Sequence, residues 1–183
     1  MKKVFILNGV GSSGKGEFAS RVGKYIPTIK YSIVDIVKES AKVLGWDGGK
    51  TEKDRRFLSD MVDLATEYND SPYKDVETLV SDFKSKLEAE VLIIDMRDPK
   101  DIARAVKDFE AETILIKNPN VGKIDSNHAD ANVNDYKYDY IIENDGTLEQ
   151  LDKMAYLFCE QVVKNNCFKK PVRFKCSNLV GEV

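Results

Sequence analysis

The chain has 183 residues, of which 42% are hydrophobic and 32% are charged, and its formal net charge is −3. This length and composition are typical of one globular domain with a substantial core, and the net charge provides no overall attraction to nucleic acid or to an anionic membrane. The three cysteines lack the spacing of a zinc site or a disulfide framework, and no apolar stretch approaches the roughly 20 residues of a membrane helix. Since the first residues do not resemble a signal peptide, we expect a cytoplasmic protein that does not enter a membrane.

The first predicted element is a short buried strand that runs directly into a glycine-rich loop. The stretch reads Val4-Phe5-Ile6-Leu7-Asn8-Gly9-Val10-Gly11-Ser12-Ser13-Gly14-Lys15-Gly16. Gly9, Gly14 and Lys15 have the spacing of a P-loop, in which backbone N–H groups surround a phosphate and the lysine contacts the outer phosphates. We therefore predict that a nucleotide binds through the loop and the start of the following helix, at Gly9, Gly11, Ser12, Ser13, Gly14, Lys15, Gly16 and Glu17.

One position departs from the full P-loop pattern. Gly16 stands where a Ser or Thr hydroxyl would reach a magnesium ion. Without that hydroxyl, the ion would depend more heavily on the phosphates, on water and on Asp95. Glu17 could contribute through a water molecule, although a carboxylate in the first turn of a helix is equally explained by the helix dipole.

The segment that follows is predicted to be mostly helical. After a helix over 15–24 and a short strand over 28–31, periodic apolar residues predict three helices, which begin at the caps Ser32, Thr51 and Ser71. The first two caps are each followed by an acid three residues on, Asp35 and Asp54. Arg55 and Arg56 lie on the second of these helices, and because adjacent helical residues point about 100° apart, only one of them can face a site. We expect the helices of 33–89 to bind an acceptor and one of these arginines to contact its phosphate; which of the two does so stays open.

A second buried strand, over 91–95, ends in a carboxylate. A hydrophobic run followed by Asp95 is the Walker-B-like pattern, so we predict that Asp95 holds magnesium-bound water, with a cap on a nearby loop or helix as the alternative. Arg97 follows just past the strand. Its guanidinium could bind an anionic acceptor in bidentate fashion; the alternative is an ion pair with Asp98 or Asp101.

The last part of the chain carries a long polar segment between two strands. After a helix opened by Asp98-Pro99 and a strand over 113–117, residues of about 118–135 show no period, and a loop of this length is typical of a lid. Its flanking Lys117 and internal Lys123 could supply charge, whereas phosphoryl transfer does not need a strong base such as His128.

The chain then ends in a strand, a helix and a basic tail. A strand over 138–143 precedes the last helix, which opens with a capping box of Thr147 and Gln150. Residues 166–183 form the tail. Because few aromatic residues alternate with its basic ones, we expect a solvated or partner-docking tail and do not expect nucleic-acid binding.

Strands that alternate with helices predict a three-layer α/β/α P-loop fold with a five-stranded parallel sheet, in a single domain of residues 1–165. The carboxyl ends of parallel strands share one edge of the sheet. We therefore expect the P-loop, Ser32, the segment 95–97 and Asn118 to meet there. The sequence does not predict an oligomeric state.

Parts of the chain resemble known small-molecule kinases. Gly14-Lys15-Gly16 resembles the nucleoside monophosphate kinases of the adenylate kinase type, although Glu17 replaces the threonine that follows in them. A longer resemblance is to bacteriophage-type deoxynucleoside monophosphate kinases and animal-type phosphomevalonate kinases. It is carried by Arg56-Phe57-Leu58-Ser59-Asp60-Met61, Ile94-Asp95-Met96-Arg97 and Tyr138-Asp139-Tyr140-Ile141-Ile142-Glu143-Asn144-Asp145-Gly146-Thr147-Leu148-Glu149.

This resemblance implies an ATP- and Mg²⁺-dependent transfer of the γ-phosphoryl group onto a small phosphorylated acceptor. By this resemblance, Lys15 would hold the ATP phosphates and Arg97 would bind the acceptor, so we expect these two to be the catalytic residues. From the helix geometry above, either Arg55 or Arg56 would join Arg97 in binding the acceptor. We expect a (deoxy)nucleoside monophosphate as the acceptor, with phosphomevalonate or a non-catalytic nucleotide-binding role as alternatives. The chain departs from its relatives in one respect, since it has no arginine between Arg104 and Arg173, where they tend to place a lid arginine.

Overall fold

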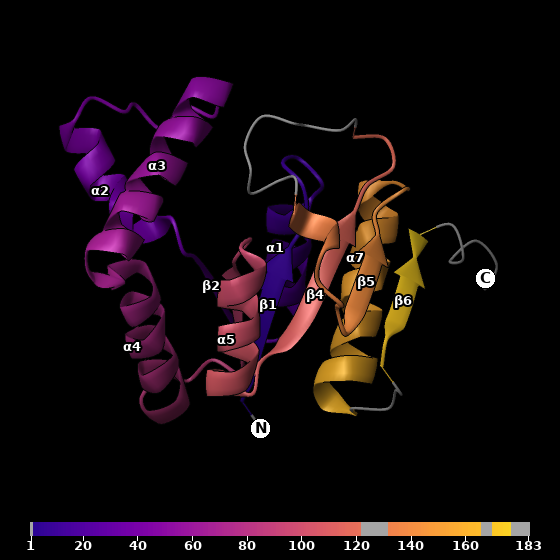
Figure 1. Cartoon of the computed structure of the whole chain (residues 1–183). Helices are drawn as coiled ribbons and strands as arrows, with labels where there is room; N and C mark the ends of the chain where they lie inside the picture. The colour runs from indigo at the N-terminus through magenta and orange to yellow at the C-terminus, as the bar shows by residue number, and fades with distance from the viewer. Residues whose placement is uncertain (1, 122–131, 166–169, 177–183) are drawn as a thin grey trace.

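The computed structural model describes residues 2–121, 132–165 and 170–176. Helices and strands alternate along most of the chain, as Figure 1 shows. The elements are β1 (Lys3–Asn8), α1 (Lys15–Tyr25), β2 (Thr28–Ser32), α2 (Asp35–Val43), α3 (Glu52–Asn69), α4 (Ser71–Ser85), β3 (Val91–Asp95), α5 (Pro99–Phe109), β4 (Glu112–Lys117), η1 (Asn132–Asn134), β5 (Tyr140–Glu143), α7 (Leu148–Phe158), η2 (Cys159–Lys164) and β6 (Val172–Lys175).

The strands form one parallel sheet in the order β2-β3-β1-β4-β5-β6. The expectation of a parallel sheet between helices is confirmed, but the expected number of five strands is wrong, because the described chain forms six. The sixth strand, β6, lies in the segment that the sequence analysis assigned to the basic tail. Its signal is weak because the strand has only four residues and lies at the sheet edge, where charged residues are common. Arg173 and Lys175 pair with Glu143 of β5 at 2.9 and 3.0 Å, while Phe174 between them is buried.

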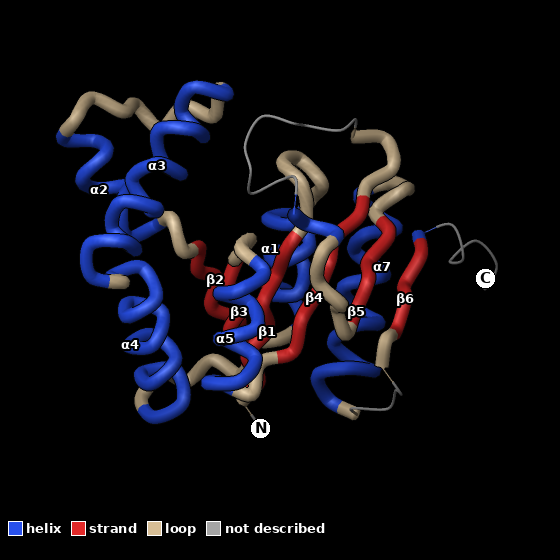
Figure 2. The backbone as a smooth tube through the Cα atoms, in the orientation of Figure 1, coloured by secondary structure: helices blue, strands red, loops and turns tan. Residues whose placement is uncertain are grey.

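Two apolar clusters hold helices against the two faces of the sheet, which gives the three layers visible in Figure 2. Helices α1 and α7 pack on one face, and α4 and α5 pack on the other. The strand β1 is buried along its whole length because its side chains alternate between the two clusters. At the centre of the first cluster, the Phe158 ring contacts Phe5 and Phe18 edge-on, with centroid distances of 5.2 and 5.6 Å.

Helices α2 and α3 extend beyond the β2 side of the sheet, as Figure 1 shows, and α3 contains no buried residue. A capping box of Thr51 and Asp54 begins α3, as the sequence predicts. The predicted Ser32 cap is wrong: Ser32 ends β2, and its backbone N–H donates to Asp35 Oδ2 at 2.9 Å. The Asp35 carboxylate accepts this hydrogen bond, and α2 is capped at Val34 and begins at Asp35, two residues later than predicted. Within the described residues, no helix combines the length and apolar character that crossing a membrane requires.

Candidate nucleotide and acceptor site

The loop between β1 and α1 has an irregular backbone that depends on glycine. Gly9, Ser12 and Gly14 have positive φ angles of 152°, 62° and 101°. A Cβ atom on Gly9 would lie 2.5 Å from the Ile116 carbonyl oxygen, and one on Gly14 would collide with the Asn144 side chain. Glycine is therefore required at both positions for conformation and for space. The loop closes through a 3.2 Å hydrogen bond from the Ser13 N–H to the Val10 carbonyl.

Lys15 is the first residue of α1 and its side chain folds back over the loop. Its Nζ donates to the Gly9 carbonyl at 2.6 Å and to the Val10 carbonyl at 3.2 Å, and the residue is buried. The first N–H groups of an α-helix have no intrahelical acceptor, so the start of α1 presents unsatisfied donors and the positive end of the helix dipole. An anion at this point would meet both a full positive charge and backbone donors.

Two asparagines brace the loop, and sequence reasoning did not identify either as part of the site. Asn8 is fully buried; it accepts a hydrogen bond from the Gly9 N–H at 2.7 Å and donates to the Arg97 carbonyl at 3.3 Å and to the Tyr138 hydroxyl at 2.7 Å. Asn144 donates to the Ser13 carbonyl at 3.0 Å. The sequence did contain a signal for Asn8, which is a polar residue at the end of the apolar run of residues 4–7. An amide buried at that position needs hydrogen-bond partners.

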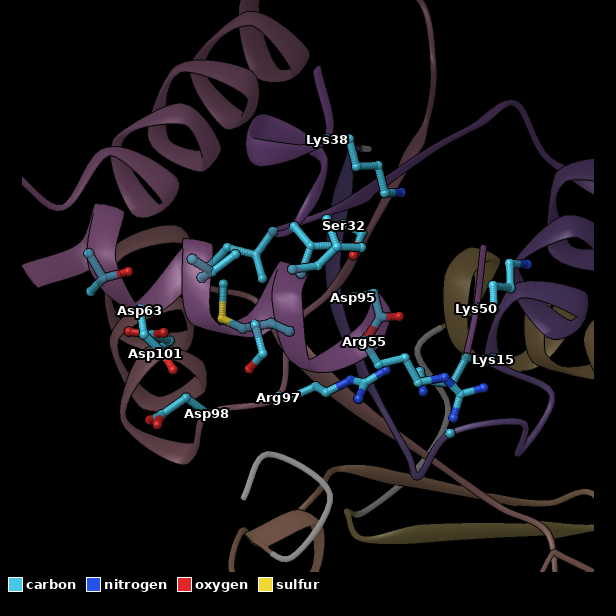
Figure 3. Close-up of a pocket in the computed structure, with 18 of the residues that line it drawn as sticks. Lys15, Ser32, Lys38, Lys50, Arg55, Asp63, Asp95, Arg97, Asp98 and Asp101 are labelled. Carbon is cyan, nitrogen blue, oxygen red and sulfur yellow. The ribbon is translucent and has the colours of Figure 1, made fainter. Parts of the chain in front are cut away.

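A cavity of about 730 Å³ opens beside the loop. Its volume is typical of a small-molecule binding site. Figure 3 shows the polar side chains that line it. Of the residues predicted from the sequence, this cavity brings together Gly11, Ser12, Lys15, Arg55, Asp95 and Arg97. Gly9, Ser13 and Gly14 of the loop, and Gly16 in the first turn of α1, do not line the cavity.

The structure distinguishes the two neighbouring arginines of α3. Arg55 lines the cavity, whereas Arg56 does not; the Arg56 side chain is 79% exposed, and its Nε lies 3.9 Å from Asp60 Oδ2. Glu17 also does not line the cavity. Its carboxylate is 48% exposed and pairs with Arg21 at 2.8 Å, one turn along α1. Arg56 and Glu17 therefore lie apart from the other predicted residues.

Asp95 ends β3 at the edge of the cavity, next to Leu7 of β1 and Ser32 of β2 in the sheet register. Its Oδ1 atom is buried and has no hydrogen-bond partner among the described residues. A buried carboxylate oxygen costs free energy unless a donor or a cation satisfies it. Asp95 is therefore suited to hold a metal ion or its water, and the ion pair of Glu17 makes that residue a poorer ligand.

The far wall of the cavity carries residues that the sequence analysis did not select. Leu58, Val62 and Asp63 are such residues on α3; they follow the predicted Arg55 at helical spacing and line the cavity with it. Asp101, in the first turn of α5, faces them. Burial, followed by the nearby carboxylates of Asp98 and Asp70, raises the pKa of Asp101 to about 6. These residues of α3 are recognised as part of the site only because they lie on the helix face that points to the cavity. The sequence alone does not identify that face.

Some predicted features lie outside the described residues. Most of the lid-like segment, with Lys123 and His128, belongs to the range 122–131. Lys117 ends β4, and its carbonyl accepts a 2.7 Å hydrogen bond from the Asn144 N–H. Over the described ranges, no group of three or more His, Cys, Asp or Glu side chains could hold a metal ion by itself.

Comparisons with known proteins give a distant structural likeness. Neither a protein-family model nor a curated protein sequence matches the chain. Among solved structures, the chain is similar to a mutant of the APS kinase CysC of Mycobacterium tuberculosis, with a TM-score of 0.39 and 14% identity over 87% of this chain and 98% of that chain. A likeness at this level does not assign the chain to a family.

Proposed function

We propose that the protein transfers the γ-phosphoryl group of ATP, with Mg²⁺, to the phosphate of a small acceptor, and that the acceptor is a (deoxy)nucleoside monophosphate. The observation that carries this proposal is the single cavity shared by Lys15 of the P-loop, Asp95 at the end of β3, and two arginines, Arg55 and Arg97. This arrangement offers positive charge on both sides of a transferring phosphoryl group.

On the donor side, the loop and Lys15 would bind the ATP phosphates. An incoming phosphate would provide Lys15 Nζ with an anionic acceptor in place of the Gly9 and Val10 carbonyls, and charge-assisted hydrogen bonds of this kind are stronger than neutral ones. Asp95 would hold Mg²⁺ through its buried Oδ1, directly or through water. The bound ion would neutralise charge on the β- and γ-phosphates.

On the acceptor side, Arg97 and Arg55 would orient the acceptor phosphate, and the helical region of about 33–89 would form the acceptor-binding part of a single domain. An oxygen of that phosphate attacks the γ-phosphorus in line, while the bond from the γ-phosphorus to the bridging oxygen of ADP breaks. Such a reaction depends on position and charge neutralisation more than on a strong base.

A pair of variants tests the acceptor assignment. Single-turnover transfer from ATP is measured with a panel of nucleoside monophosphates and with phosphomevalonate. Arg55→Ala should raise the KM for the acceptor about tenfold or more, because a charged hydrogen bond is lost. The matched control, Arg56→Ala, removes the same charge one residue away from the cavity and should change KM less than twofold. Equal effects of the two variants would contradict the acceptor role of Arg55, and no product with any acceptor at full ATP occupancy would contradict the kinase proposal.

A second candidate is a nucleotide-binding protein that does not transfer phosphate. It is favoured by Gly16, which lacks the magnesium-binding hydroxyl, and by the ion pair that keeps Glu17 at Arg21. Titration calorimetry with ATP beside the product assay separates the two candidates, because only the second predicts ATP binding without product.

A further inference from the structure

The cavity carries opposite charges at its two ends. Figure 3 shows Lys15, Arg55 and Arg97 toward one end, while Asp63, Asp98 and Asp101 gather toward the other. On α3 alone, Arg55 and Asp63 are eight positions apart, which corresponds to about 12 Å along the helix axis. This separation suits a ligand with a phosphate at one end and a group of different charge at the other.

Asp101 is the carboxylate of the acidic end that most needs a ligand. It is half-buried and makes no hydrogen bond or ion pair with another described residue. The cation that acts on it is Arg104, which is already shared by Asp70, Glu77 and Asp108 at 2.6 to 3.7 Å.

The acidic neighbours of Asp101 make its negative charge still less favourable in the absence of a ligand. Asp98 and Asp63 repel its charge, and the Asp98 carboxylate already accepts the Lys100 N–H at 2.7 Å as the cap of α5. Lys100 also lines this wall, but its side chain is exposed. Asp101 therefore presents acceptor oxygens to the cavity with little local compensation.

An ionised carboxylate only accepts hydrogen bonds, so the acidic end favours ligands that present N–H donors. It repels an anionic group, and phosphomevalonate carries a carboxylate at the end opposite its phosphate. Between the two ends, Leu58 and Val62 form an apolar wall that suits a flat ring. A guanine base presents two adjacent donors, N1–H and N2–H₂, whereas the N3–H of uracil and thymine lies between two carbonyl acceptors.

We propose that the acceptor is a guanine-type nucleoside monophosphate and that Asp101 selects the base by accepting its N–H donors, with Asp63 and Asp98 making this end of the cavity acidic. This inference rests on the proposed function of the same cavity. It assigns base selection to the first turn of α5, while the arginines bind the phosphate.

The test uses binding, so that it does not depend on turnover. Trp46 is the only tryptophan of the chain and lines the cavity, so its fluorescence reports binding of GMP, UMP and inorganic phosphate. The wild type should bind GMP about tenfold or more tightly than UMP, because a mismatched base leaves the carboxylate without a donor. In Asp101→Asn, whose amide can both donate and accept, the ratio should fall to about threefold or less, while affinity for inorganic phosphate stays within twofold.

A wild-type preference for UMP, an unchanged GMP-to-UMP ratio in Asp101→Asn, or no binding of either nucleotide at millimolar concentration would overturn the inference. The control variant Glu88→Gln also removes one carboxylate charge, but on an exposed loop away from the cavity, so it should leave the GMP-to-UMP affinity ratio unchanged. If the ratio changes as expected but no acceptor is phosphorylated, base selection stands and the transfer reaction does not.

Discussion

Removing the charge of Asp101 should stabilise the folded protein at neutral and alkaline pH. Burial raises the pKa of this carboxyl from 3.8 to about 6; Asp98, Asp70 and Asp63 add to the effect, and Arg104 opposes it. One pKa unit corresponds to about 1.4 kcal/mol, so ionised Asp101 disfavours the fold by about 3 kcal/mol before solvent screening. Because the side chain is only half-buried and an acid in the first turn of a helix gains about 0.3–1 kcal/mol from the dipole, we expect a net gain of about 1–2 kcal/mol from Asp101→Asn.

The gain should depend on pH in a defined direction. Since the folded pKa is raised, the contribution of Asp101 is most favourable below pH 4, where the group is protonated in both states, and is lost as pH rises through about 6. The variant should therefore be more stable than the wild type at pH 8 and nearly equal to it at pH 4.

Urea unfolding followed by far-ultraviolet circular dichroism measures the difference at both pH values. Glu88→Gln serves as the control, because it removes one exposed carboxylate and should change stability by less than about 0.5 kcal/mol. A variant that is destabilised at pH 8, or that gains equally at pH 4 and pH 8, would refute the assignment of an uncompensated charge to Asp101.

Three further variants, two of them with a matched control variant, test the loop and the core. Lys15→Ala should weaken ATP binding about tenfold or more by calorimetry, and an affinity within twofold of the wild type would remove the basis for the phosphate site. Gly14→Ala should lower both ATP affinity and thermal stability, because Gly14 has a φ of 101° and a Cβ atom there would clash with Asn144. The control Gly16→Ala should keep ATP affinity, because the space around its Cβ is open. Similar behaviour of the two variants would contradict the loop geometry. Phe158→Ala should cost about 3–5 kcal/mol in urea unfolding, while Leu148→Ala, 63% exposed on the same helix, should cost less than about 1 kcal/mol; a small loss for Phe158 would show that the aromatic cluster is not the core.

Local signals predicted much of the fold. The P-loop spacing predicted the turn between β1 and α1, and the pairs Thr51–Asp54 and Thr147–Gln150 predicted two helix starts, because a capping box involves only residues three positions apart. Strand β6 was missed for the converse reason. Its stability depends on Glu143 and on the burial of Phe174, and neither the partner strand nor the aromatic cluster lies near it in the sequence.

The sequence by itself predicted a phosphate-type loop, a strand that ends in Asp95, and an arginine, Arg97, just beyond that strand. Only the tertiary structure decided that Arg55 rather than Arg56 lines the cavity, and that Asp101 lies at its opposite, acidic end. The physical reason is that glycine spacing and caps act between neighbouring residues. The direction of a helix face and the charge of a cavity depend on how α3, β3 and α5 pack together, and no stretch of the chain encodes that packing alone.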